Sequence, residues 1–193
     1  MTSGALGQVE RVDVSLTIPA PPSGDPRWSL ELAGGATMDL GCYVLHAARQ
    51  VSRWLGVGEP TVSDVTTRLR GPSVDAAVTA HLRYPRGVLG TVEWDMDATE
   101  RSMVWTVTGS AGSATAPSFG VPHLDNRLLV TQNGQTVTEV LGDQTSYTYQ
   151  LAAVAATLRD GTPFLLPDED AVANAELIDA RYRATGLPLR GGG

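Results

Sequence analysis

Runs of alternating apolar and polar residues fill the middle of this chain and restrict what it can fold into. In residues 74–84 every second residue is apolar, and the same period returns in residues 88–96 and 103–107. A period of two is that of a β-strand with one buried face, because successive side chains point to opposite sides of the strand. The Pro-Arg-Gly turn at 85–87 is too short for a helical crossover, so we expect neighbouring antiparallel strands.

Similar patterns predict further strands on both sides of this centre. Residues 11–18 alternate in the same way, and residues 61–70 form a more polar candidate strand. The small residues of "GSAGSATA" at 109–116 are expected to turn the chain. Asn133-Gly134 separates two alternating runs, which is the strongest short-range signal for a hairpin. We therefore expect about six to nine strands in a mostly antiparallel sheet.

Three segments carry helix signals. The first follows Gly34-Gly35, and its apolar residues recur at helical spacing: Leu40, Val44, Ala47, Val51 and Leu55. The second runs from a Ser146 cap to Gly161. The third begins with an acidic turn and ends before Gly186, and one of its sides carries Ala171, Ala175, Ile178 and Tyr182. Together these features predict one α+β domain over residues 1–193, a mostly antiparallel open β-sheet with about three helices packed on one face.

Composition excludes several classes of function. A net charge of −7 argues against nucleic acid as a partner, because nucleic-acid sites need clustered cations. No apolar run approaches the ~20 residues of a membrane helix, and the N-terminus lacks a secretory signal, so we expect no membrane partner. The one cysteine, Cys42, excludes an internal disulfide and a cysteine-based zinc site, so we expect a protein of the reducing cytoplasm. All 14 basic residues are arginine, so a mechanism that needs lysine must take it from another chain.

A second stripe on the first predicted helix is polar, and it consists of Asp39, Tyr43, His46, Gln50 and Arg53. Residues four apart lie one turn above each other, so Asp39 and Tyr43 share a face at the positive end of the helix dipole. One interpretation of this spacing is structural, with Asp39 stabilising the helix N-terminus and Tyr43 packed half-buried over the sheet. The other is catalytic, with both side chains directed at a substrate.

Residues 34–62, "GGATMDLGCYVLHAARQVSRWLGVGEPTV", resemble the start of the C-terminal domain in the Gfo/Idh/MocA oxidoreductases. The family pattern has a glycine triplet, then Asp-x-Gly-x-His/Tyr, a long helix and Glu-Pro. Other blocks agree in the same order: "SGALGQV", "GDPRW", "VDAAVTAHLRYPRGVLGTV", "TGSAGSATA", "YTYQLAAVAATLRDGTP" and "DEDAVANAELIDARYRATG". The resemblance extends from Ser3 to Arg190 and is specific, because it rests on many separated blocks.

This resemblance implies that the chain is the second part of a two-domain NAD(P)-dependent enzyme. In the family, an N-terminal Rossmann domain binds the nicotinamide cofactor and supplies a lysine from a Glu-Lys-Pro motif. The C-terminal domain supplies an Asp and a His or Tyr to the substrate hydroxyl, and these positions are Asp39 and Tyr43 here. The sequence departs from the family in having Ala33 or Ala36 for one glycine, and in lacking both the Gly-x-Gly-x-x-Gly motif and the lysine. We therefore expect no cofactor bound by this chain alone, and NAD(P) for the complete enzyme.

The missing lysine has a chemical consequence. A tyrosine needs a neighbouring cation to bring its pKa of about 10 toward neutral pH. The helix N-terminus offers only about half a charge, and Asp39 favours the protonated phenol. Arg27, in the preceding loop, can act electrostatically, but its pKa above about 12 prevents it from donating a proton. The isolated chain is therefore expected not to turn over.

Four further residues are weaker candidates for substrate binding. Arg27 and Trp28 lie where the loop enters the helix, and a structural lid is the alternative role for both. His46 lies one turn beyond Tyr43, where it is either a proton relay or a surface histidine, and His123 lies in a loop that we expect to reach the site. The scattered histidines lack metal-ligand spacing, so no metal site is predicted.

Two functions remain open. The chain is either the substrate-binding and oligomerisation half of an oxidoreductase acting on a hydroxyl compound such as a sugar or polyol, or a non-catalytic ligand-binding or oligomerisation module derived from that family. The retained Asp39–Tyr43 pair favours the first, and the absent cofactor domain favours the second. The resemblance implies a homodimer or higher oligomer through the sheet face, with Trp94 and Trp105 as large residues on one side. A Rossmann domain, in cis or in trans, is the other expected partner.

Overall fold

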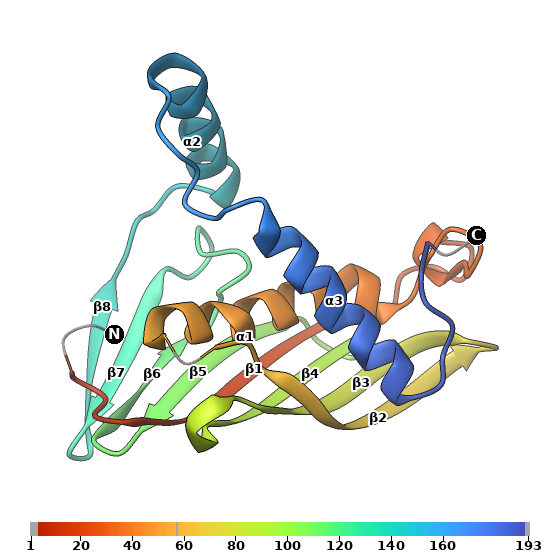
Figure 1. Cartoon of the computed structure of the whole chain (residues 1–193), viewed down its shortest axis with the longest axis horizontal. Helices are drawn as coiled ribbons and strands as arrows, with labels where there is room; N and C mark the ends of the chain where they lie inside the picture. Colours follow the sequence, from red (N-terminus) through yellow and green to blue (C-terminus); the bar gives the residue numbers. More distant parts are fainter. Residues whose placement is uncertain (1–3, 57, 192–193) are drawn as a thin grey trace.

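The structure, a computed structural model that describes residues 4–56 and 58–191, contains one open sheet of eight strands in its described part (Figure 1). Ser3 and Val57, which belong to the family-like blocks, lie outside the described residues. The strands are β1 (Val9–Pro19), β2 (Thr61–Gly71), β3 (Val74–Arg83), β4 (Leu89–Ala98), β5 (Ser102–Gly109), β6 (Gly112–Ala116), β7 (Arg127–Gln132) and β8 (Gln135–Val140). Their spatial order is β2-β3-β4-β1-β5-β6-β7-β8.

β1 lies inside the sheet although it comes first in the chain. It pairs in parallel with β4 and antiparallel with β5, and the other neighbouring strands are antiparallel. The expectation that the central strands are all antiparallel neighbours is therefore wrong at one place, because β1 separates β4 from β5. Trp94 and Trp105 consequently do not lie on adjacent strands.

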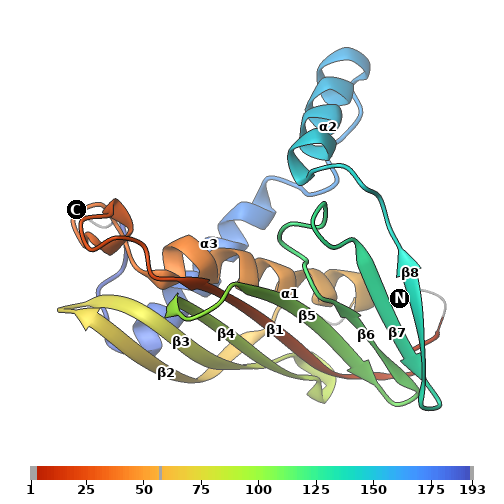
Figure 2. The ribbon, with the colours of Figure 1, turned by 180° about the vertical axis from the view of Figure 1, so that it is seen from behind.

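Two helices cover one face of the sheet, α1 (Cys42–Leu55) and α3 (Glu169–Ala184) (Figures 1 and 2). The alternating apolar residues of β1, β3 and β4 form the core with the buried stripe of α1. Trp94 is fully buried on this helical face, and Trp105 stacks on Trp54 of α1 with ring centres 5.1 Å apart. The open face of the sheet therefore carries neither tryptophan, and its exposed residues are mostly polar.

The third helix, α2 (Ser146–Asp160), stands away from the sheet (Figures 1 and 2). None of its residues is buried, and its apolar side chains, such as Leu151 and Leu158, are exposed. The prediction of an α+β fold with three helices and a mostly antiparallel open sheet is confirmed, but only α1 and α3 pack on the sheet. Within the described residues, no helix combines the length and the apolar character needed to cross a membrane.

The buried side of α3 differs from the predicted one. Ile178 and Tyr182 are buried as expected, but Ala171 and Ala175 are exposed. Only the C-terminal half of α3 reaches the core, whereas its first turn is attached to α1 through the buried carboxylate of Asp170. A stripe of small apolar residues was therefore a poor guide to the face that packs.

Turn and helix-end predictions had mixed outcomes. Asn133 and Gly134 both have positive φ and join β7 to β8, as the hairpin signal predicted. Gly161 and Gly186 follow the ends of α2 and α3 with positive φ, again as predicted. The α2 cap is Thr145 rather than Ser146. Residues 109–116 are not all turn, because Gly112–Ala116 forms β6, whose small residues hid its strand character.

Candidate functional site

Asp39 and Tyr43 lie at the start of the first helix. Thr37–Gly41 form a π-helical turn, η2, that continues directly into α1. The Asp39 side chain is 31% exposed and Tyr43 is 60% exposed. Tyr43 is therefore not packed half-buried over the sheet, which the structural interpretation required. Both candidates lie at one accessible end of α1.

Arg27 connects the preceding loop to Asp39. It belongs to a short 3-10 helix, η1 (Pro26–Trp28), whose N-cap is Asp25. The Arg27 guanidinium donates to the two Asp25 carboxylate oxygens at 2.9 and 3.0 Å, and its Nη1 lies 3.5 Å from Oδ2 of Asp39. Hydrogen bonds from Arg27 lower the pKa of Asp25 to about 2, and the same pairing raises the pKa of Arg27. The candidate carboxylate thus has a permanent cation beside it.

The contacts of Trp28 favour a structural role. Its indole N–H donates to the carbonyl of Pro21 at 3.2 Å, and the Arg70 guanidinium lies 4.2 Å from the centre of its ring. Because Arg70 belongs to β2, this cation–π contact ties the loop to the sheet. Trp28 therefore holds the segment that carries Arg27.

The surroundings of Tyr43 keep its phenol protonated. The charges of Cys42, Tyr147 and Asp39, together with partial burial, all raise the pKa of Tyr43, and the charge of Cys42 is the largest cause. Burial raises the pKa of the Cys42 thiol as well, so its thiolate forms only in alkaline solution. At neutral pH the Tyr43 hydroxyl is consequently a proton donor.

The two candidate histidines are not brought together. His46 points its Nδ1 at Oδ2 of Asp170 on α3, 3.3 Å away, and burial is the main cause that lowers the pKa of His46. His123 is exposed in the loop between β6 and β7, and no hydrogen bond or ion pair joins it to Asp39 or Tyr43 among the described residues. Across residues 4–56 and 58–191, no group of three or more His, Cys, Asp or Glu side chains is arranged to hold a metal ion.

Sequence reasoning missed a buried cluster beneath the η2 turn. Asp75, at the start of β3, is fully buried and accepts hydrogen bonds from the backbone N–H and the hydroxyl of Thr37 at 2.7 and 2.5 Å. Tyr182 of α3 and Arg190 near the C-terminus donate to its other oxygen at 3.2 and 3.4 Å. Asp75 falls on a polar position of the alternating run, which normally means a solvent-facing side chain. The alternating pattern therefore concealed it.

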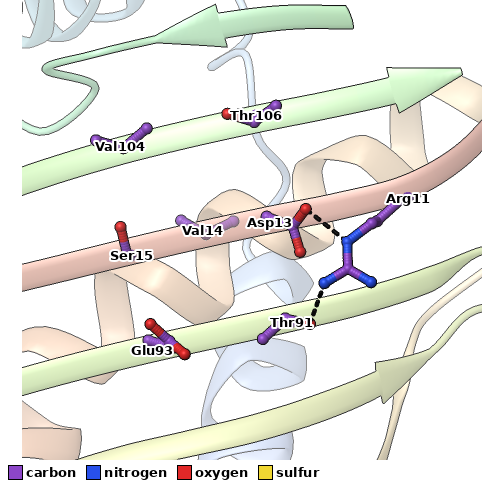
Figure 3. A pocket seen from close by; sticks show the side chains of 8 residues that line it. All are labelled: Arg11, Asp13, Val14, Ser15, Thr91, Glu93, Val104 and Thr106. Atoms are coloured by element: carbon purple, nitrogen blue, oxygen red, sulfur yellow. Dashed lines mark hydrogen bonds and ion pairs between the residues drawn. The ribbon is translucent and has the colours of Figure 1, made fainter.

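Three hollows lie elsewhere on the sheet. One, about 580 Å³, is apolar and lies on the helical face between Trp54 of α1 and the strands β5 to β8. A second, about 270 Å³, lies on the open face between β1, β4 and β5 (Figure 3), and a third, about 260 Å³, is lined by residues of β1, β2, β3 and β4. In the second hollow Arg11 donates to Asp13 and Thr91, both at 2.7 Å. None of these three hollows is lined by Asp39 or Tyr43.

Comparisons with known proteins identify the family of this chain. Residues 1–115 match the family described as the GFO/IDH/MocA C-terminal domain. Among curated proteins, the chain is similar to D-xylose 1-dehydrogenase (NADP(+)) 2 of Haloferax volcanii, with 30% identity over 187 residues, which cover 95% of this chain and 56% of that protein. The chain therefore spans about half the length of this relative.

Solved structures share the fold. The aldose-aldose oxidoreductase from Caulobacter crescentus, complexed with glycerol, has a TM-score of 0.81 and 20% identity over 96% of this chain and 56% of its own. The 3-ketoreductase KijD10 from Actinomadura kijaniata, in complex with NADP and TDP-benzene, has a TM-score of 0.77 and 23% identity over 95% of this chain and 56% of its own. Together with the family match, which covers more than half of the sequence, these similarities show that the chain belongs to the Gfo/Idh/MocA family and corresponds to its C-terminal domain.

Proposed function

We propose that this chain is the substrate-binding half of an NAD(P)-dependent oxidoreductase that acts on a hydroxyl or carbonyl group of a sugar-like molecule. The observation that carries the proposal is the placement of Asp39 and Tyr43, two accessible polar side chains at the start of one helix with Arg27 beside the carboxylate. The relatives support the substrate class, because their names refer to D-xylose, aldoses and a ketoreductase that was solved with a TDP compound.

The residues of this chain do not fit the cofactor itself. Pyrophosphate is usually held by free backbone N–H groups of a glycine-rich turn at a helix N-terminus. Here the N–H groups of Gly34 and Gly35 donate to the carbonyls of Ser29 and Arg27 at 2.7 and 2.8 Å, and the Thr37 N–H donates to Asp75. The dinucleotide must then be held by another domain.

At the substrate, the roles of this chain's residues follow from their charges. The protonated Tyr43 hydroxyl is suited to donate a hydrogen bond to a substrate oxygen and to pass it a proton as negative charge develops there. Asp39, ionised beside Arg27, is suited to accept a hydrogen bond from a neighbouring substrate hydroxyl and so to orient the ring. A lysine from the second domain would lower the pKa of Tyr43, which the surroundings raise in this chain.

Exposed apolar surface supports docking of that second domain. The helical face retains the 580 Å³ apolar hollow, and α2 presents Tyr147, Leu151 and Leu158 to solvent. Leu165, in the segment after α2, is 92% exposed. Large exposed apolar side chains and apolar hollows are typical of interaction sites. We propose that a cofactor-binding domain, in cis or in trans, covers it, and that a second copy packs on the open face shown in Figure 3.

The alternative is a non-catalytic ligand-binding or oligomerisation module of the same family, in which Asp39 and Tyr43 take no part in chemistry. The test joins a family Rossmann domain ahead of Ser3 and follows NAD(P)H absorbance with aldoses and polyols. We expect hydride transfer in the joined protein, and a roughly 10²- to 10⁴-fold loss of kcat in Tyr43→Phe with little change in cofactor affinity, because the phenol acts on the substrate oxygen. Tyr149→Phe is the matched control, because Tyr149 is also an exposed tyrosine in the first turns of a helix, α2. A joined protein without activity, or a Tyr43→Phe variant within twofold of its parent, would favour the non-catalytic module.

A further inference from the structure

We propose that Asp75 is a positioning residue, whose buried carboxylate clamps the turn that carries Asp39 and thereby sets the direction of Asp39 and Tyr43. It acts through Thr37 and does not touch substrate. The inference rests on the proposed function for its meaning in catalysis, but the clamp itself is a property of this chain.

The clamp replaces a missing local cap. The first N–H groups of a helix have no intrahelical partner and are usually satisfied by a Ser, Thr, Asp or Asn side chain at the N-cap. The N-cap of η2 is Ala36, which makes no side-chain hydrogen bond. Asp75 takes over this role from a distant strand, because its Oδ2 accepts from both the N–H and the hydroxyl of Thr37. Two hydrogen bonds to one residue fix its position and its rotation.

The other side of Thr37 is held by the core. Its hydroxyl oxygen, which donates to Asp75, accepts from the indole N–H of Trp94 at 3.2 Å. Thr37 and Trp94 are both fully buried, so solvent cannot replace these bonds. Asp39, two residues further on, donates its N–H to the carbonyl of Gly35 at 3.2 Å and follows any movement of the turn.

The charge on Asp75 is compensated by two buried guanidinium groups. Arg190 Nη2 lies 3.4 Å from Oδ1, and Arg181 Nη2 lies 3.6 Å from Oδ2. Arg190 also donates from Nε to the carbonyl of Gly34 at 2.9 Å, so it grips the glycine pair directly. The clamp therefore joins β3, α3 and the C-terminal segment to the turn.

The clamp also explains the glycine at position 35. A Cβ there would lie closer than van der Waals contact to Oδ1 of Asp75, and φ is +132°, a conformation that side chains rarely adopt. Gly35 is thus required for close approach of a carboxylate to the backbone. Gly35 therefore makes room for an internal anion, the Asp75 carboxylate.

Hydrogen exchange on the chain tests the clamp. In the unmodified chain, the Thr37 and Asp39 amides should exchange slowly, and fast exchange at Thr37 would overturn the proposal without any variant. Thr37→Val keeps the shape and removes the hydroxyl bonds. We expect its Met38 and Asp39 amides to exchange about tenfold faster or more, while the amides of 44–51 stay within twofold. Thr37→Ser should restore slow exchange, and Thr106→Val, which removes a hydroxyl bond within the sheet, should leave the turn unchanged.

If Thr37 only stabilises the fold as a whole, Thr37→Val should speed amide exchange in α1 and in the η2 turn together, and that result would overturn the proposal. Unchanged exchange rates in both segments would overturn it as well. In the joined two-domain protein, Thr37→Val should lower kcat at least tenfold with unchanged cofactor KM, and Thr37→Ser should recover it. Unaltered kcat in Thr37→Val would also overturn the positioning role. If the parent joined protein shows no hydride transfer, the proposed function fails, and the exchange data still decide whether the clamp exists.

Discussion

Gly41 lies between Asp39 and Tyr43 in the sequence. Replacing it with alanine has two opposing effects on the free energy of unfolding: a gain in helix propensity and a steric clash with Trp94. Gly41 lies inside the continuous η2–α1 helix with an ordinary helical φ of −61°. In an unpacked helix, alanine is favoured over glycine by about 1 kcal/mol. At this position, however, a Cβ would lie 2.8 Å from Cε2 and 3.0 Å from Cζ2 of Trp94. Normal carbon contacts are about 3.5–4.0 Å, so the turn or the indole must move by roughly 1 Å.

Neither partner can move freely. Trp94 is 1% exposed, and its N–H is bonded to Thr37. Overpacking of this kind costs about 1–3 kcal/mol, and breaking the Trp94–Thr37 bond leaves a buried donor at a cost of about 1–3 kcal/mol. After the gain in helix propensity is subtracted, Gly41→Ala should lower the free energy of unfolding by about 3 kcal/mol and Tm by about 6–12 °C.

Urea unfolding and thermal scans of the isolated chain measure this effect. Gly24→Ala is the matched control, because a Cβ at Gly24 meets nothing within 4 Å, and it should be neutral or slightly stabilising. In a Trp94→Phe background the cost of Gly41→Ala should shrink, since the clashing atoms are those of the indole. A Gly41→Ala chain as stable as its parent, or more stable, would refute the steric argument.

Three further predictions concern the chain as it stands. Calorimetry should detect no micromolar binding of NADPH, because the N–H groups of the glycine pair are already bonded; micromolar binding would require a cofactor site in this chain. Burial is the main cause that lowers the pKa of His46 in the folded state, so the unfolded state binds the proton of this imidazole more readily, and the free energy of unfolding should fall as pH drops below about 6.5. Urea unfolding of His46→Gln should show a flatter pH dependence than that of the parent chain. Equal pH dependence in the two chains would exclude His46 as the cause. Light scattering at micromolar concentration should give a dimer or larger species, and Val104→Arg in the open-face hollow should dissociate it; a monomeric parent would contradict packing through that face.

Much of this fold could be predicted because it follows local rules. The alternation of apolar and polar residues predicted most strands. The glycines that follow α2 and α3 predicted where these helices end, because both adopt the left-handed conformation. The placement of Asp39 and Tyr43 at the accessible start of a helix also followed from spacing, while their catalytic roles stay predictions. What escaped prediction depends on pairing across the chain. β6 is defined by its neighbours β5 and β7, since Ser113 and Ala114 have no strand signature of their own.

The burial of several polar residues could not be predicted from the sequence for the same reason. The position of Asp75 in its strand predicts an exposed side chain. Asp75 is buried because Thr37, Tyr182 and Arg190, which are far away in sequence, donate hydrogen bonds to it. The first turn of α3 is held by Asp170 against Arg49 and Arg53 of α1, so charge pairing, rather than an apolar stripe, orients that end. Long-range polar contacts leave no periodic trace in a single sequence.

The position of β1 has a consequence for how the sheet assembles. Its Arg11 pairs with Leu89 on one side and with Thr108 on the other, so both contacts close long loops. The hairpin-connected groups β2 to β4 and β5 to β8 can each form from near neighbours, whereas β1 must join them across large sequence separations. Until β1 is inserted, β4 and β5 are unprotected edges that invite pairing with other chains. Insertion of β1 should therefore limit the folding rate, and chains that are slow at this step should be lost to aggregation.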